Sequence, residues 1–224
     1  MKSLKVKFEK LITEQRWDID YHLPPLEITK YSPSILCNIE SCADIVTEKR
    51  NPTLEPDKMF TYIDISSIDV TTGIITNPQE LMGEEAPSRA RKVVRAGDII
   101  ISTCRPTRGA IAIVPVEMDN QICSTGFSVI RAHDNINNHY LHFILRSDVV
   151  KEQFRKFSTG SSYPAILDDD VKKTIIPLPK TSIQDEIARN VNEQTEKRNK
   201  KINDANKIWL KKLDDCLSEI MCLK

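Results

Sequence analysis

The stretch SRARKVVRAGDIIISTCRP, residues 88–106, decides the fold that we expect for this chain. Two runs of β-branched residues lie on either side of the RAGD sequence at residues 95–98. Glycine and aspartate are typical of tight turns, because glycine adopts positive φ angles and aspartate hydrogen-bonds to nearby backbone. The pattern predicts a tight turn that leads into a buried strand at residues 99–102.

Further strands are expected on both sides of this stretch. Runs rich in β-branched residues and bounded by Gly, Pro, Asn or Asp predict strands at residues 60–65, 93–103, 110–116, 126–131 and 174–179. Apolar residues at near-helical spacing predict helices at residues 2–15 and 139–157. The fold class that follows is α+β, with a mixed or β-rich domain.

The sequence changes in character after Pro179, because residues 181–224 contain neither Gly nor Pro. Ser182 is a suitable N-cap, and Asp185 at the third helical position completes a variant of the capping box. We expect one long C-terminal helix, in which about 40 residues span about 60 Å. Its apolar stripe consists of Ile183, Ile187, Val191, Ile202, Trp209, Leu213, Leu217 and Ile220.

A helix of this length with a single apolar stripe requires a partner along its length. We expect a coiled coil with a helix from another chain or from the same assembly. The alternative is a helix that folds back on its own domain, which a break near residues 199–206 would permit. The chain is therefore divided into a domain at residues 1–180 and a helical spacer or dimerisation region at residues 181–224.

The composition is that of a globular protein, with 40% hydrophobic and 29% charged residues. The 224 residues suit one domain of ordinary size plus an appendage, or two small domains. No stretch approaches 18 apolar residues, and the N-terminus lacks the apolar core of a secretory signal. We therefore expect a cytoplasmic protein without a membrane partner.

The sequence favours neither a cofactor nor a catalytic site. Its glycines form neither GxGxxG nor GxxxxGK[ST], so no backbone cradle for phosphates is expected. The cysteines form no CxxC pair, and no carboxylate follows His139 and His142 at the next turn, so we predict no metal site. The acidic run at residues 168–170 has no second motif element for a metal-dependent nuclease, and no Asn-Pro string carries the aromatic residue of a base-flipping methyltransferase.

The zero net charge hides a segregation of charge along the chain. Residues 14–70 hold 11 acidic and 5 basic side chains, whereas residues 86–112 hold six basic side chains against Asp98 alone. Residues 180–212 hold nine basic and five acidic side chains. Arginine dominates the middle block and makes bidentate contacts to guanine edges and phosphates. Its loops therefore suit nucleic-acid recognition, with a solvated basic edge that guards exposed strands as the alternative.

Five strings that occur in order carry a family resemblance. They are FTYIDISSID (60–69), SRARKVVRAGDIIISTCRP (88–106), STGFSVIR (124–131), GSSYPAI (160–166) and TIIPLPKTSIQDEIA (174–188). Together with the upstream RWDIDYHLP at residues 16–24, they resemble the specificity subunit of type I restriction-modification systems. The resemblance extends over nearly all of the chain.

The resemblance implies a sequence-specific DNA-recognition subunit without catalysis of its own. In that family the target-recognition domain enters the DNA groove, and a long helix packs against a second such helix. The subunit carries methyltransferase subunits and, through them, the restriction–translocase subunit. A full-length member has two recognition domains and two helices, whereas this chain has one of each.

The half-size architecture implies a homodimer through antiparallel helices, which would read an interrupted palindrome in double-stranded DNA. Two alternatives stay open. One is a protein–protein interaction module without DNA binding, and the other is the recognition part of a larger fused restriction–methylation enzyme. The resemblance does not assign the recognised sequence, because specificity positions vary in such a family.

The residues that we expect to contact DNA lie in three segments of the predicted domain. They are Ser88, Arg89, Arg91, Lys92, Arg105, Arg108, Ser161, Ser162 and Tyr163. Lys92 is expected on a phosphate, and the hydroxyl groups suit phosphates and base edges alike. The alternative for residues 160–163 is a turn that packs Tyr163 and Pro164 against the core.

Overall fold

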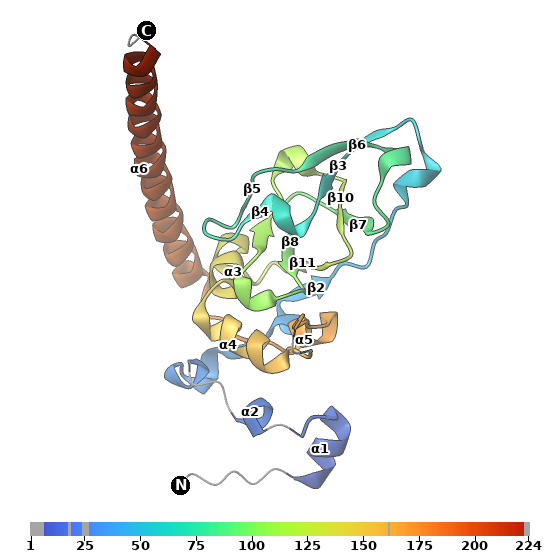
Figure 1. Ribbon diagram of the computed structural model, residues 1–224. Helices are drawn as coiled ribbons and strands as arrows, with labels where there is room; N and C mark the ends of the chain where they lie inside the picture. Colours follow the sequence, from blue (N-terminus) through green and yellow to red (C-terminus); the bar gives the residue numbers. More distant parts are fainter. Residues whose placement is uncertain (1–6, 18, 24–26, 161, 222–224) are drawn as a thin grey trace.

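The computed structural model describes residues 7–17, 19–23, 27–160 and 162–221. Figure 1 shows a β-rich domain with the helices α3, α4 and α5 at one end. The long helix α6 stands beside this domain and extends away from it, and α1 and α2 lie at the opposite end from the tip of α6 (Figure 1).

Two four-stranded sheets form the centre of the domain. The first has the order β6 (Gln79–Met82), β3 (Met59–Ile63), β10 (Gln121–Ser124), β7 (Ala90–Val94). The second has the order β2 (Ala43–Ile45), β11 (Phe127–Ala132), β8 (Ile99–Ser102), β9 (Ile111–Ile113). Within these sheets the β3–β10 pair is parallel and the other pairs are antiparallel, which confirms the mixed α+β class.

Two small strand pairs and several single turns of 3-10 helix complete the domain. The pairs are β1 (Leu36–Asn38) with β12 (Ile175–Pro177), and β4 (Ile68–Asp69) with β5 (Ile74–Ile75). The 3-10 turns are η1 (Ile28–Lys30), η2 (Pro33–Ile35), η3 (Ile39–Ser41), η4 (Pro52–Leu54), η5 (Ile65–Ser67), η6 (Gly83–Glu85), η7 (Pro106–Arg108) and η8 (Val116–Met118).

The predicted turn at residues 95–98 and the buried strand after it are confirmed. Gly97 has a φ angle of 87°, and the Asp98 carboxylate accepts a hydrogen bond from the Arg95 backbone N–H at 2.8 Å. The turn moves the chain from one sheet to the other, because β7 belongs to the first sheet and β8 to the second. The single strand predicted at residues 93–103 is therefore two strands.

Strand β8 is buried on both of its faces. Ile99 and Ile101 belong to a core cluster with Leu141 and Phe154 from the helices. Ile100 belongs to a second cluster, which contains Val129 and residues of the first sheet. The alternation of side chains along a strand thus connects the helix layer and the two sheets through these three isoleucines.

The helices differ from the sequence prediction at residues 139–157. Two helices, α3 (Asn138–Leu145) and α4 (Asp148–Phe157), replace the single one expected. The Asn137 side chain caps α3, and the Ser147 hydroxyl donates to the Ile144 carbonyl at 2.6 Å where the chain breaks. A serine hydroxyl in this position offers the backbone an alternative to continued helix.

The remaining short helices are α1 (Phe8–Glu14), α2 (Ile19–His22) and α5 (Asp168–Lys172). Helix α1 occupies only part of the predicted range 2–15, of which residues 2–6 lie outside the described part of the chain. The acidic run at residues 168–170, considered above for a metal-dependent nuclease, forms the first turn of α5.

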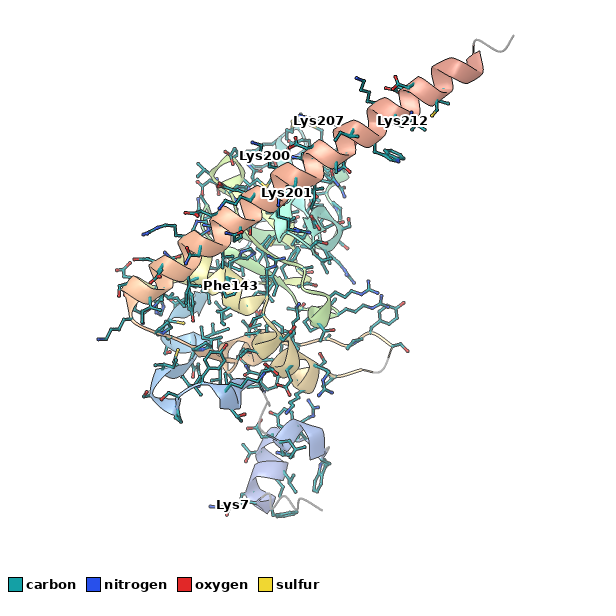
Figure 2. The ribbon with its side chains drawn as sticks, turned by 90° about the vertical axis from the view of Figure 1, so that its left-hand side faces the viewer. Lys7, Phe143, Lys200, Lys201, Lys207 and Lys212 are labelled. Atoms are coloured by element: carbon teal, nitrogen blue, oxygen red, sulfur yellow. The ribbon has the colours of Figure 1, made fainter. Side chains whose placement is uncertain are left out.

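Helix α6 runs from Thr181 to Met221 without a break, so the interruption considered near residues 199–206 does not occur. Ser182 is its second residue rather than its N-cap, because the amides of Ile183 and Gln184 already bond the Lys180 carbonyl. In the view of Figure 2, α6 passes in front of the domain at Lys200 and Lys201, and Lys212 lies on the part that extends past it.

The first turns of α6 pack on the chain's own domain. Ile187 contacts the main core cluster and Val191 is half-buried, so these two members of the predicted stripe are partly covered within the chain. The Gln184 side chain accepts from the Asn137 amide at 2.9 Å and donates to the Pro179 carbonyl at 2.8 Å. The stripe is therefore partly covered by the chain's own domain at Ile187 and Val191, and the partner helix expected along α6 stays a prediction.

Candidate nucleic-acid interface

Backbone hydrogen bonds tie the loops of the basic block to one another. The Thr103 amide and hydroxyl both donate to the Gly126 carbonyl at 2.8 Å, and the Thr125 amide donates to the Arg89 carbonyl at 2.8 Å. The Ile166 amide bonds the Thr103 carbonyl at 3.0 Å. The predicted segments at residues 88–92, 105–108 and 160–163 therefore lie around one end of the two sheets.

The arginines of these loops differ in what occupies their N–H donors. Arg91 donates to the carbonyls of Ala90 and Pro87, at 2.7 and 3.3 Å. Within the described residues, no hydrogen bond or ion pair engages the guanidinium groups of Arg89, Arg105 or Arg108. Their charges are therefore available to a ligand, whereas Arg91 is largely held by its own backbone.

Lys92, which the sequence analysis expects on a phosphate, is buried in the structure. Its ammonium group donates to the Phe127 carbonyl at 2.6 Å and lies 3.6 Å from the Asp168 carboxylate. The side chain is only 11% exposed. Alternate residues of a strand point to opposite faces, and Lys92 lies on the buried side of β7, the edge strand of the first sheet, where its ammonium group is bonded inside the domain.

Arg105 and Tyr163, predicted separately, are in contact. The Arg105 guanidinium carbon lies 4.8 Å from the centroid of the Tyr163 ring. Tyr163 is 77% exposed, which excludes the alternative that this turn packs the ring against the core. Ser88 and Ser162 are exposed in the neighbouring loops, and Ser161 lies outside the described residues.

Three further cations border these loops and were missed by the sequence analysis. Lys49 is exposed and pairs through an isolated bridge with Lys92, beside Arg91. Lys151 and Arg155 of α4 border a hollow that also contains Thr107 of η7 and the acidic residues Glu27, Asp148 and Glu152. The spacing of four residues between Lys151 and Arg155 on the polar face of α4 was the signal available in the sequence.

The second half of α6 presents an uncovered apolar face. All side chains described between residues 200 and 217 are exposed, among them Ile202, Trp209, Leu213 and Leu217 of the predicted stripe. Ile183 is 46% exposed near the start of the helix. Ile220 lies in the helix, but its side chain is outside the described part.

Some of the thiols and histidines considered for a metal site have partners within the domain. A hydrogen bond from Cys42 lowers the pKa of Cys37 to about 6. The same hydrogen bond, and to a lesser extent burial, raises the pKa of Cys42. Burial lowers the pKa of His142 to about 4, while its Nε2 lies 3.2 Å from the Ile111 carbonyl. In the described ranges, no three His, Cys, Asp or Glu side chains are grouped as metal ligands.

No helix described is long and apolar enough to cross a bilayer.

Comparison with known proteins places these features in a family. The sequence profile for the type I restriction modification DNA specificity domain matches residues 60–207. This range contains the first sheet apart from Met59, the strands β8, β9 and β11 of the second sheet, and α6 as far as Lys207. The type I restriction enzyme HindI specificity subunit of Haemophilus influenzae is 30% identical over 126 residues, or 53% of this chain and 28% of that protein.

Solved structures show the same similarity. The HsdS subunit from Thermoanaerobacter tengcongensis is 43% identical, with a TM-score of 0.66 over 74% of this chain and 43% of that subunit. A chain from a structure on complex assembly of the type I R-M system is 44% identical, with a TM-score of 0.67 over 72% of this chain and 42% of the other. The chain thus spans less than half the length of the relatives it matches.

Proposed function

The chain belongs to the type I restriction modification DNA specificity domain family, and we propose from this premise that it is the non-catalytic DNA-reading subunit of such a system. The observation that carries the proposal is the group of arginines, Arg89, Arg105 and Arg108, on tied loops at one end of a domain of this family. Guanidinium groups whose N–H donors have no acceptor within the domain suit both phosphates and base edges.

The proposed DNA surface refines the set expected from sequence. It consists of Ser88, Arg89, Arg105, Arg108, Ser162 and Tyr163, with Arg91 at its margin and Lys49, Lys151 and Arg155 as added phosphate contacts. Lys92 is excluded because it is bonded inside the domain. Phosphate contacts position such a protein, and contacts to base edges specify the sequence.

The assembly that we infer is a homodimer. The domain at residues 1–180 and the helical region at residues 181–224 correspond to one reading unit, and the match covers 43% of the HsdS chain. The exposed apolar face of α6 beyond residue 200 would pair with the same face of a second copy, in antiparallel orientation. A two-fold axis between two readers favours an interrupted palindrome.

The remaining partners follow from membership of the family. We infer that methyltransferase subunits bind this chain and carry out the chemistry, and that a restriction–translocase subunit joins through them. The compartment that we infer is the cytoplasm, where the DNA of the cell is accessible. No cofactor is assigned to this chain, since its role is to direct other subunits to their site.

Methylome sequencing tests the proposal. Cells that express this chain with its methyltransferase should acquire methylation at one motif, and cells without the chain should lack it. We expect an interrupted palindrome, because two identical domains read the two halves. A methylation pattern that does not change when the chain is removed would contradict the proposed function, and an asymmetric motif would contradict the homodimer.

A further inference from the structure

We propose that Arg105 and Tyr163 form a preassembled guanine reader, in which the tyrosine ring orients the guanidinium toward the O6 and N7 acceptors of a guanine in the major groove. The inference rests on the proposed DNA-reading function and assigns a base type to one of its side chains. Arginine to guanine O6 and N7 is the commonest specific contact between proteins and DNA.

The stacking geometry leaves the reading edge of Arg105 free. The guanidinium carbon lies 4.8 Å from the ring centroid of Tyr163, within the range of a cation–π contact. Such a contact uses the face of the guanidinium, while the N–H donors lie in its plane. In the part of the chain that the structure describes, these donors have no hydrogen-bond acceptor of their own.

The backbone of Arg105 is held in a conformation that arginine rarely adopts. Its φ and ψ angles are 48° and 54°, in the left-handed region, where non-glycine residues are uncommon. The Arg105 amide donates to the Pro164 carbonyl at 2.7 Å, and Cys104 forms a bridge with Ala165. Residues in such conformations concentrate at functional sites, where the surrounding structure fixes them.

These two constraints act on the same side chain from opposite ends. The bond to Pro164 fixes the Cα of Arg105, and Tyr163, the residue before Pro164, supports its guanidinium. A phosphate contact needs a positive charge but little fixed orientation. Arg108, the last residue of η7, provides such a charge. Bidentate readout of a base needs a fixed plane, and the Arg105–Tyr163 pair supplies it.

Binding of variants to the motif found by methylome sequencing tests this inference. With Arg105→Ala, the preference for guanine at one position of each half-site should fall by about 5-fold to 150-fold, the range for a bidentate base contact. Arg105→Lys should lose the same preference, because an ammonium cannot form the planar fork. Arg108→Ala is the matched control. It should weaken binding to every sequence to the same extent and leave the preference for guanine unchanged.

Tyr163 is a positioning residue, and its variants separate support from direct contact. Tyr163→Phe keeps the ring and should retain the guanine preference. Tyr163→Ala should lower that preference at the position affected by Arg105→Ala and at no other. Wild-type protein should also bind less tightly when 7-deazaguanine, which lacks the N7 acceptor, replaces that guanine, while Arg105→Ala should be insensitive to the replacement.

The outcomes distinguish this inference from the function on which it rests. Site-specific binding by the wild type, together with an Arg105→Ala variant that keeps every base preference, would overturn the reader and leave the DNA-reading function in place. Insensitivity of the wild type to 7-deazaguanine at every guanine of the motif would do the same. Absence of site-specific binding by the wild type would overturn both.

Discussion

The basic residues of this protein separate into those used within the fold and those left for a ligand. Lys92 and Arg91 bond carbonyl groups of their own chain, and Arg95 pairs with Glu48 at 3.2 Å. Arg89 and Arg108 are exposed at turns and have no such bonds among the described residues. The count of positive charges along the sequence therefore overstates the number available to DNA.

Replacement of Lys92 tests this distinction. Lys92→Ala removes the donor to the buried Phe127 carbonyl, which leaves that carbonyl without its partner. We expect the free energy of unfolding to fall by about 1–3 kcal/mol, the cost of a buried unpaired polar group. Urea denaturation measures the change, and Arg89→Ala, at an exposed turn, should leave stability within about 0.5 kcal/mol.

The two variants should rank in the opposite order when their DNA affinity, rather than their stability, is measured. Folded Lys92→Ala should bind DNA as the wild type does, whereas Arg89→Ala should bind more weakly and with a smaller dependence on salt. Weak DNA binding by a stable Lys92→Ala protein would contradict this assignment and indicate that Lys92 contacts DNA.

His142 predicts a dependence of stability on pH. Burial, together with the nearby charge of Arg146, lowers its pKa from 6.5 to about 4 in the folded protein. Between pH 6.5 and 4, the unfolded chain binds a proton at this residue more readily than the folded protein does. The contribution of neutral His142 to stability is therefore fully present above pH 6.5 and is lost as the pH falls toward 4. Between these two pH values, the free energy of unfolding should fall by at most about 1.4 kcal/mol for each pH unit.

His142→Gln isolates this contribution. The difference in unfolding free energy between wild type and variant should shrink as the pH falls from 6.5 to 4, because the wild type alone carries the proton penalty. Denaturant curves at several pH values measure it. A difference that stays constant across this window would contradict a buried neutral His142.

At the scale of elements, the sequence predicted best where one signal acted alone. The turn at residues 95–98 carries Gly and Asp and adjoins a run of isoleucines, and both the turn and β8 formed as expected. Strand β10 was missed because its four residues, QICS, alternate too weakly in polarity. The break between α3 and α4 depends on side-chain bonds of Ser147 and Arg146, which periodicity does not contain.

The candidate site could be predicted only in part for a similar reason. Pattern and composition identified the loops with Arg89, Arg105 and Tyr163. They did not show that Lys92 points inward or that Arg105 lies on the Tyr163 ring, because both depend on how loops distant in sequence are tied together. Lys151 and Arg155 lie near the other basic residues because α4 packs beside η7. The sequence does not show this contact, since the two segments are distant along the chain.

Asp98 connects the turn between the sheets with the neighbouring strand. Its buried carboxylate accepts from the Arg95 amide and from the Arg131 guanidinium, at 2.8 Å for Nε and 2.9 Å for Nη2. Asp98→Ala should lower the free energy of unfolding by about 1–3 kcal/mol, because the Arg95 amide loses its acceptor. The Arg131 guanidinium is 49% exposed and is solvated in the variant, so the loss of the ion pair adds little. Asp98→Asn should cost less, since its amide oxygen still accepts from the Arg95 amide; equal losses would contradict this account.

At the scale of the whole molecule, the length of α6 exceeds what its own domain covers. Its first turns bury Ala188 against the core, whereas the side chains described from residue 200 to 217 are exposed. The apolar residues of both halves lie on one continuous face, because Val191, Ile202, Trp209 and Leu213 follow the helical period. The same face thus contacts the domain first and extends beyond it as a surface for another helix.

The proposed homodimer makes a prediction for two substitutions on different faces of α6. Leu213→Asp places a charge on the apolar face and should yield a monomer, since each leucine or isoleucine buried at such a seam contributes about 1.5–3 kcal/mol. Ile208→Asp is the matched control. Ile208 is 71% exposed and lies about 100° around the helix from Trp209, so its variant should remain a dimer.

Sedimentation velocity distinguishes the outcomes through mass, because one chain weighs 25.6 kDa. Wild type and Ile208→Asp should sediment at twice this mass, and Leu213→Asp at this mass. The loops proposed to read DNA lie on the domain rather than on the second half of α6, so the monomeric variant keeps them. It should bind a single half-site as the wild type does and lose the added affinity for the full palindrome. A monomeric wild type, or a Leu213→Asp protein that still sediments as a dimer, would contradict pairing through this face of α6.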